Sequence, residues 1–79
     1  MNLKQLVAQR LKNILLEKGL TQYSLYRISG VPQSTISTIL NGNIKTIKLS
    51  TLHEICAGLN MTLFEFFDDE SLKNRHIEN

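Results

Sequence analysis

The sequence has few of the residues on which disulfide-bonded, metal-binding and membrane proteins depend. It contains one cysteine in 79 residues, which excludes a disulfide within the chain. Cys56, His53 and His76 are too few ligands, at the wrong spacing, for a structural zinc site. No apolar run approaches the roughly 18 residues of a membrane span, and no signal-peptide pattern opens the chain. We therefore expect a cytoplasmic protein with no metal, no other cofactor and no membrane partner.

Patterns typical of enzymes are also missing. No nucleophile is placed with a base, no carboxylates are paired, and no phosphate-binding loop is present. A chain of 79 residues has room for one domain with a modest core, which makes a large buried active-site cavity unexpected. We predict that the protein is not an enzyme.

Acidic residues are nearly absent from the first 48 positions. This part holds seven lysines and arginines and one acid, Glu17, for a net charge of +6. From Leu49 onward two basic residues stand against six acids, for a net charge of −4, and the whole chain carries +2. Such asymmetry suggests that one part of the protein faces a polyanion. A merely solvated surface can look the same at this size, so the charge alone does not decide.

Apolar residues recur at helical spacing through the chain, without the alternation of a strand or any repeat. The pattern and its capping signals predict helices at about 2–18, ending at Gly19; 22–29, capped by Thr21; 33–41, after Pro32; 49–59; and a short helix opened by the capping box from Thr62 to Glu65. The predicted class is all-α, with five short helices. Residues 1–67 form the predicted domain, and residues 68–79 a polar C-terminal tail.

The periodicity also assigns a buried face to each helix. The second helix is predicted to bury Leu25 and Ile28. The fourth helix is predicted to bury Leu52, Ile55, Cys56 and Leu59. This position gives Cys56 a packing role in preference to redox or metal chemistry.

The third predicted helix, within GVPQSTISTILNG at residues 30–42, carries a polar face without any charge. The polar stripe consists of Gln33, Ser34, Ser37, Thr38 and Asn41, while Ile36, Ile39 and Leu40 line the opposite side. Solvated helix faces normally use Glu, Lys and Arg, whereas Ser and Thr are mediocre helix formers. Short hydroxyls and amides match the donors and acceptors of base edges in the major groove of DNA. The stripe therefore favours a base-reading helix, with a solvated face as the alternative.

The sequence resembles the Xre/Cro-type helix-turn-helix regulators, which include the DNA-binding domain of lambda repressor. The resemblance rests on GLTQYSL (19–25), GVPQSTIS (30–37), the Asn41-Gly42 pair and LSTLHEICAGLNMTLFEFF (49–67), and it covers roughly residues 3–67. It implies a lambda-repressor-like domain in which the second and third helices form the DNA-binding pair. It also implies a homodimer, at least on DNA, that binds a near-palindromic double-stranded operator with half-sites about one helical turn apart.

The resemblance also implies roles for individual residues. Gln22 would bind a phosphate and brace the amide of Gln33, which looks like the principal adenine reader. The candidates for base reading are Gln33, Ser34, Ser37 and Thr38. The candidates for contacts with the DNA backbone are Gln22, Tyr23, Asn41, Asn43, Lys45 and Lys48. For Lys45 and Lys48, ordinary solubility is the alternative.

The chain departs from the family pattern at three places. Leu15 and Leu40 stand where the family commonly has a buried Arg–Glu pair, and we expect the two leucines to touch. Tyr26 stands where the family prefers a small residue, so either the second and third helices spread or the ring leaves their crossing. Pro32 replaces a common Ser or Thr cap, which leaves the third helix without a side-chain cap.

The last predicted helix carries three aromatic residues, Phe64, Phe66 and Phe67. They cannot all be buried in so small a domain; Leu63 and either Phe66 or Phe67 should close the core. An exposed aromatic, Phe64 in the first place, would help a dimer contact in which Phe67 is the second candidate. Core packing or incidental exposure is the alternative.

These observations predict a sequence-specific transcriptional regulator that binds double-stranded DNA, a repressor that reads the major groove with the third helix. The alternative is a protein-interaction module with a protein partner, such as the antitoxin of a toxin–antitoxin pair or an adaptor for another regulator. A neighbouring gene for a small toxin-like protein would favour the alternative.

Overall fold

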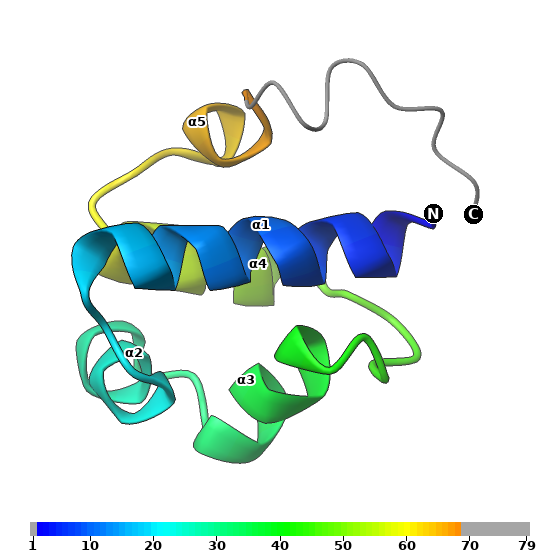
Figure 1. The fold of residues 1–79 in the computed structure, drawn as a ribbon, viewed down its shortest axis with the longest axis horizontal. Helices are drawn as coiled ribbons and strands as arrows, with labels where there is room; N and C mark the ends of the chain where they lie inside the picture. Colours follow the sequence, from blue (N-terminus) through cyan, green and yellow to red (C-terminus); the bar gives the residue numbers. More distant parts are fainter. Residues whose placement is uncertain (1, 69–79) are drawn as a thin grey trace.

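The computed structural model describes residues 2–68, which form helices joined by short turns and one longer loop (Figure 1). The helices are α1 (Leu3–Lys18), α2 (Gln22–Ser29), α3 (Gln33–Leu40), α4 (Leu49–Gly58) and α5 (Leu63–Phe67). The described residues contain no strand, and the predicted all-α architecture of five short helices is confirmed. Apart from Asp68, the predicted polar tail at 68–79 lies outside the described residues.

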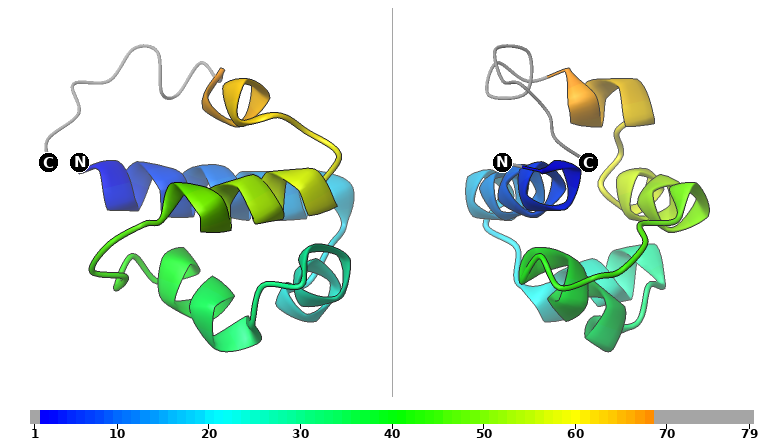
Figure 2. Two further views of the ribbon diagram at one scale, coloured as in Figure 1. Left: turned by 180° about the vertical axis from the view of Figure 1, so that it is seen from behind. Right: turned by 90° about the vertical axis from the view of Figure 1, so that its right-hand side faces the viewer.

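The helices are arranged around a central layer made by α1 and α4, which lie side by side (Figure 2). On one side of this layer α3 packs against α1, and α2 packs against α4 and α3. On the opposite side lies α5, which contacts α4. None of the helices in residues 2–68 has the length and apolar character of a membrane-spanning helix.

The helix ends follow the capping signals in the sequence. The Thr21 side chain accepts a hydrogen bond from a backbone amide in the first turn of α2, at 3.1 Å. Thr62 and Glu65 form the predicted capping box of α5. Gly19 and Gly30 end α1 and α2 with φ angles of 66° and 77°, a left-handed conformation that costs glycine little.

The core is made by aliphatic side chains of α1 to α4 and is closed by Phe66 of α5. The side chains with no exposed surface are Leu11, Leu25, Ile36, Ile39, Ile55 and Phe66. The predicted buried face of α4 is confirmed at Leu52, Ile55, Cys56 and Leu59. Of the two aromatics that could close the core, Phe66 does so, whereas Phe67 remains 37% exposed.

The prediction that Ile28 is buried is wrong, because the end of α2 meets α4 through its backbone. The Ile28 side chain is 46% exposed, while Leu25 is fully buried. A β-carbon placed on Gly58 of α4 would lie 2.8 Å from the Ile28 carbonyl oxygen and 2.9 Å from the Ser29 α-carbon. The absence of a side chain at Gly58 thus lets the α2 backbone approach α4, and the Ile28 side chain stays outside the contact.

Replacing Gly58 with alanine is expected to lower the free energy of unfolding by about 1–3 kcal/mol, because the added methyl group would overlap the backbone of α2. Urea unfolding followed by circular dichroism measures the change. The control is Glu54→Ala at an exposed site on the same helix, which should alter stability by less than about 0.5 kcal/mol. A Gly58→Ala chain as stable as the parent would contradict the close crossing.

Candidate nucleic-acid interface

The two sides of α3 differ as the sequence predicts. Ile36 and Ile39 have no exposed surface and Leu40 is 6% exposed, so this side belongs to the core. The opposite side carries the polar stripe, in which Gln33, Ser34 and Asn41 are exposed and Ser37 and Thr38 are partly exposed. α3 ends at Leu40, and Asn41 is its C-terminal cap. All the base-reading candidates therefore lie together on one accessible face.

Hydrogen bonds within the stripe limit what each side chain can offer a partner. The Thr38 hydroxyl donates to the Ser34 carbonyl at 2.7 Å, which leaves its methyl group and its oxygen lone pairs. The Asn41 amide approaches the Ser37 hydroxyl at 3.5 Å, at the long end of the hydrogen-bond range. No hydrogen bond engages the Gln33 side chain within residues 2–68, so its amide can both donate and accept. The brace from Gln22 to Gln33 stays a prediction, since no hydrogen bond joins these two residues in the described chain.

A short turn fixes the start of α3 relative to α2. The Ser29 hydroxyl donates to the Leu25 carbonyl at 2.6 Å and accepts a hydrogen bond from the Val31 amide at 3.1 Å. Val31 is 2% exposed and anchors the turn in the core. Pro32 then caps α3 with φ −56° and ψ 144° and makes no side-chain cap bond, as predicted. The orientation of the polar stripe is therefore set by the core, the turn and the fixed φ angle of proline.

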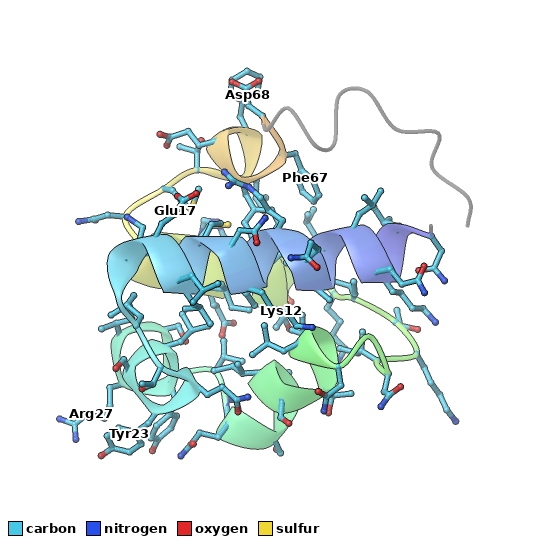
Figure 3. All side chains as sticks on the ribbon, viewed as in Figure 1. Lys12, Glu17, Tyr23, Arg27, Phe67 and Asp68 are labelled. Carbon is cyan, nitrogen blue, oxygen red and sulfur yellow. The ribbon has the colours of Figure 1, made fainter. Side chains whose placement is uncertain are left out.

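The outer face of α2 carries two tyrosines and an arginine. Arg27 donates a hydrogen bond to the Tyr23 hydroxyl at 3.2 Å, and its guanidinium carbon lies 5.9 Å from the Tyr23 ring centroid. The Tyr26 ring is 38% exposed and lies 6.0 Å from the Tyr23 ring. This arrangement favours the alternative in which the Tyr26 ring leaves the crossing of the two helices. Figure 3 shows Tyr23 and Arg27 together on the side of the molecule where α3 lies.

The loop between α3 and α4 contains two partly buried isoleucines among exposed polar side chains. Ile44 and Ile47 pack against the core, while Asn43, Lys45 and Lys48 are exposed. With Gln22, Tyr23 and Asn41, these three residues complete the predicted backbone candidates, and all six are exposed. The apolar anchors hold the loop against the domain and leave its two positive charges in solvent.

α2, α3 and the loop after α3 contain no acidic residue. No Asp or Glu occurs between Glu17 and Glu54, a stretch that includes α2, α3 and the following loop. Sequence reasoning did not select Arg27, although its spacing of four residues from Tyr23 on one helix already places the two on the same face. The segments on either side of the polar stripe in the sequence thus carry basic and hydroxyl side chains and no acidic residue.

Residues 10–71 match the model of the Cro/C1-type HTH DNA-binding domain, which covers most of the chain. The chain belongs to this family. It is therefore a helix-turn-helix DNA-binding protein of the transcription-regulator type, and the family is non-enzymatic. No curated protein matches the sequence.

Three solved structures have the same fold. A mutant of the restriction-modification controller protein C.Esp1396I has 31% sequence identity and a TM-score of 0.79; the match covers 95% of this chain and all of that one. An HTH_3 family transcriptional regulator from Vibrio cholerae has 27% identity and a TM-score of 0.78; the match covers 85% of this chain and 37% of that one. The prophage Lp1 protein 11 has 23% identity and a TM-score of 0.78; the match covers 96% of this chain and all of that one. The lambda-repressor-like fold predicted from sequence is confirmed.

Both leucines at the position of the family's Arg–Glu pair are buried. Leu15 is 7% exposed and Leu40 is 6% exposed, and they belong to one core cluster. The core cluster shared by α1 and α3 thus holds apolar side chains at the two positions where the resemblance implies a buried charge pair. Direct contact between the two side chains stays a prediction, which a double-mutant cycle tests.

Replacing Leu40 alone with glutamate is expected to destabilise the domain by about 3 kcal/mol or more, because an unpaired charge would be buried. Adding Leu15→Arg should restore at least about 1 kcal/mol if the two side chains touch. The matched control combines Leu40→Glu with Leu16→Arg, since Leu16 is the next residue and is 80% exposed. Urea unfolding measures the free energies of the parent, of Leu40→Glu, of Leu15→Arg and of the double variant. Strictly additive effects of the two substitutions would contradict the contact.

Proposed function

We propose that this protein is a sequence-specific transcriptional repressor that reads the major groove of double-stranded DNA with the outer face of α3. The observation that carries the proposal is the polar stripe, an accessible and uncharged hydrogen-bonding face on a helix of a Cro/C1-type domain. The major groove admits one α-helix and presents a distinct pattern of donors and acceptors at each base pair. A repressor of this kind acts by occupying its operator.

Base reading in this proposal centres on Gln33. Its side-chain amide has one donor end and one acceptor end, which match the N6 and N7 atoms of adenine. Ser34 can donate or accept at a neighbouring base. Thr38 can place its methyl group against a thymine methyl, because its hydroxyl proton is already donated to the Ser34 carbonyl. Ser37 completes the set of proposed base contacts.

Phosphate groups on each side of the bound groove would be held by the flanking elements. Gln22 opens α2, where the backbone amides of the helix N-terminus attract an anion. Lys45 and Lys48 add positive charge from the following loop. We add Arg27 to the backbone contacts, because its guanidinium group is held beside the Tyr23 hydroxyl on the outer face of α2. These contacts set the position of α3, and the stripe sets the sequence preference.

Two substitutions should separate base reading from phosphate binding. Gln33→Ala should cost about 1–3 kcal/mol of specific binding and relax the preference at one base position. Lys45→Ala should weaken binding to all sequences and reduce the slope of log affinity against log salt by about 1. Fluorescence anisotropy with duplexes that differ at single positions measures both effects. Lys73→Ala, which removes the same charge from the acidic part of the sequence, is the control and should leave the slope unchanged.

A homodimer on a near-palindromic operator is the second part of the proposal. Leu49, Leu63, Phe64 and Phe67 line a hollow at the junction of α4 and α5, together with Asp68. We call these four side chains the apolar patch; Phe64 is 76% exposed and Leu49 is 67% exposed. An exposed cluster of aromatic and aliphatic side chains is typical of an interaction surface. Contact between two such patches would join two domains and bring two copies of α3 to successive half-sites.

Phe64→Ser should weaken self-association and cooperative binding to a two-half-site operator, because Phe64 supplies much of the exposed apolar surface of the patch. Sedimentation equilibrium with and without the operator measures this. Leu16→Ser is the matched control, because it removes a similarly exposed apolar side chain from α1, outside the patch. An unchanged association state of Phe64→Ser would remove the proposed dimer face.

The apolar patch also supports a second candidate function, a protein-interaction module that binds a toxin or another regulator. In that case Phe64 would contact a different protein rather than a second copy of this chain. The two functions are compatible, since one domain can bind DNA through α3 and a protein through α5. Co-purification of a genetically adjacent small protein, lost on Phe64→Ser substitution, would distinguish a heterologous partner from a second copy.

A further inference from the structure

Arg10 of α1 is hydrogen-bonded to the end of α5. Its Nε atom donates a hydrogen bond to the Phe66 carbonyl at 2.7 Å, and its Nη2 atom donates to the Glu65 carbonyl at 3.1 Å. The guanidinium carbon also lies 5.8 Å from the centroid of the Phe66 ring. These residues are separated by 55 and 56 positions in the sequence. One side chain therefore connects α1 to the C-terminal end of α5.

The hydrogen bonds from Arg10 stabilise the C-terminal end of α5, a helix of five residues that is too short to be stable alone. At this end the backbone amide of Asp68 donates to the Phe64 carbonyl at 2.9 Å and to the Glu65 carbonyl at 3.3 Å. The guanidinium group adds a charge-assisted hydrogen bond to the Glu65 carbonyl, donates another to the Phe66 carbonyl, and places a positive charge at the negative end of the helix dipole. The capping box at Thr62 and Glu65 secures the other end. Phe66 is the side chain of α5 that is fully buried, so Arg10 acts at the place where α5 enters the core.

The same connection extends to the apolar patch. The rings of Phe66 and Phe67 pack edge to face, with centroids 5.1 Å apart and an interplanar angle of 77°. The Arg10 guanidinium group lies over the Phe66 ring, the Phe66 ring packs against the Phe67 ring, and Phe67 lines the patch together with Phe64. The position of the exposed aromatic side chains thus depends on an arginine that does not itself belong to the patch.

We propose that Arg10 is a positioning residue for the dimer face: by attaching α5 to α1, it fixes the angle of the apolar patch relative to α3. This inference rests on the proposed dimer. In a two-fold symmetric dimer, a change in the angle of one patch is doubled in the relative placement of the two α3 helices. Arg10 would therefore govern cooperative binding to paired half-sites and would leave binding to a single stretch of DNA unchanged.

The contacts of Arg10 with α5 separate it from Arg27 of α2 and from Lys45 and Lys48 of the loop after α3. The Arg10 guanidinium group donates hydrogen bonds to backbone carbonyls of α5. Figure 1 shows α5 on one side of the layer made by α1 and α4, with α2 and α3 on the other. Positive charge held at α5 does not face DNA bound along the polar stripe. If Arg10 positions the patch and does not bind a phosphate, its substitution should weaken dimerisation and leave the salt dependence of DNA binding unchanged.

Cys56 offers an internal probe of the docking of α5. Its side chain is 1% exposed and lies in the same core cluster as Phe66. Burial raises the pKa of the Cys56 thiol, and the nearby positive charge of Arg10 partly offsets this increase. Because it is the one cysteine in the chain, its rate of reaction with a chromogenic disulfide reagent reports how often this part of the core opens.

The test compares Arg10→Met, which keeps a long apolar stem without donors, with Arg10→Lys, which keeps the charge without the planar fork. Sedimentation equilibrium of the full chain, alone and with an inverted-repeat duplex selected by the wild-type protein, gives the dimer dissociation constant. Arg10→Met should weaken the dimer by at least about tenfold and raise the rate of the Cys56 reaction, and Arg10→Lys should be intermediate. Affinity of both variants for a duplex of unrelated sequence at low salt should stay within about twofold of wild type.

Phe64→Ser, which removes a side chain of the apolar patch and keeps Arg10, distinguishes a failure of the dimer face from a failure of the positioning role of Arg10. If Phe64→Ser loses dimerisation while both Arg10 variants dimerise as wild type, the positioning role is wrong and the dimer face stands. If Phe64→Ser also dimerises as wild type, or the wild-type chain stays monomeric with and without DNA, the dimer face and the inference fall together. If the Arg10 variants dimerise as wild type but bind unrelated DNA more weakly, with a smaller slope of log affinity against log salt, then Arg10 contacts a phosphate. That result would overturn the proposal.

Discussion

The burial of Ile36, Ile39 and Leu40 against the rest of the core is the interaction on which the structure depends. Eight residues of helix have to hold α3 in the domain and leave one face accessible. Three aliphatic side chains on one side achieve this, because they join the core while the polar stripe remains outside. In the proposed mechanism, the rigidity of that packing is what allows short side chains such as those of Ser34 and Thr38 to be placed against base edges.

The molecule divides into two sides with different chemistry. The side that carries α2, α3 and the following loop has hydroxyl, amide and basic side chains and no acidic residue from Gly19 to His53. The side that carries α5 has exposed aromatic side chains beside Glu65 and Asp68. In the proposed function, the first of these sides binds a polyanion and the second binds another protein.

The local features of the fold were predictable from sequence, because each depends on neighbouring residues. These features are the glycines that end helices in a left-handed conformation, the caps at Thr21 and Thr62, and the helical spacing of polar and apolar residues along α3. Each acts over a few positions of the sequence. Ile28 was mispredicted because α2 meets α4 through backbone at Gly58, a contact that hydrophobic periodicity does not describe. The contacts of Arg10 with α5 could not be predicted either. In sequence Arg10 is one more basic residue of α1, and the two carbonyls to which it donates lie more than 50 positions away.

Selection from a random-duplex library at about 100–150 mM salt, where nonspecific phosphate binding is weakened, tests the central claim most directly. If the polar stripe of α3 reads the major groove as part of a dimer, sequencing of the retained DNA should show an inverted repeat with half-sites about 10 base pairs apart. Retention of DNA without any enriched sequence would contradict the account, because it would mean that the stripe does not distinguish bases and that phosphate contacts alone hold the protein.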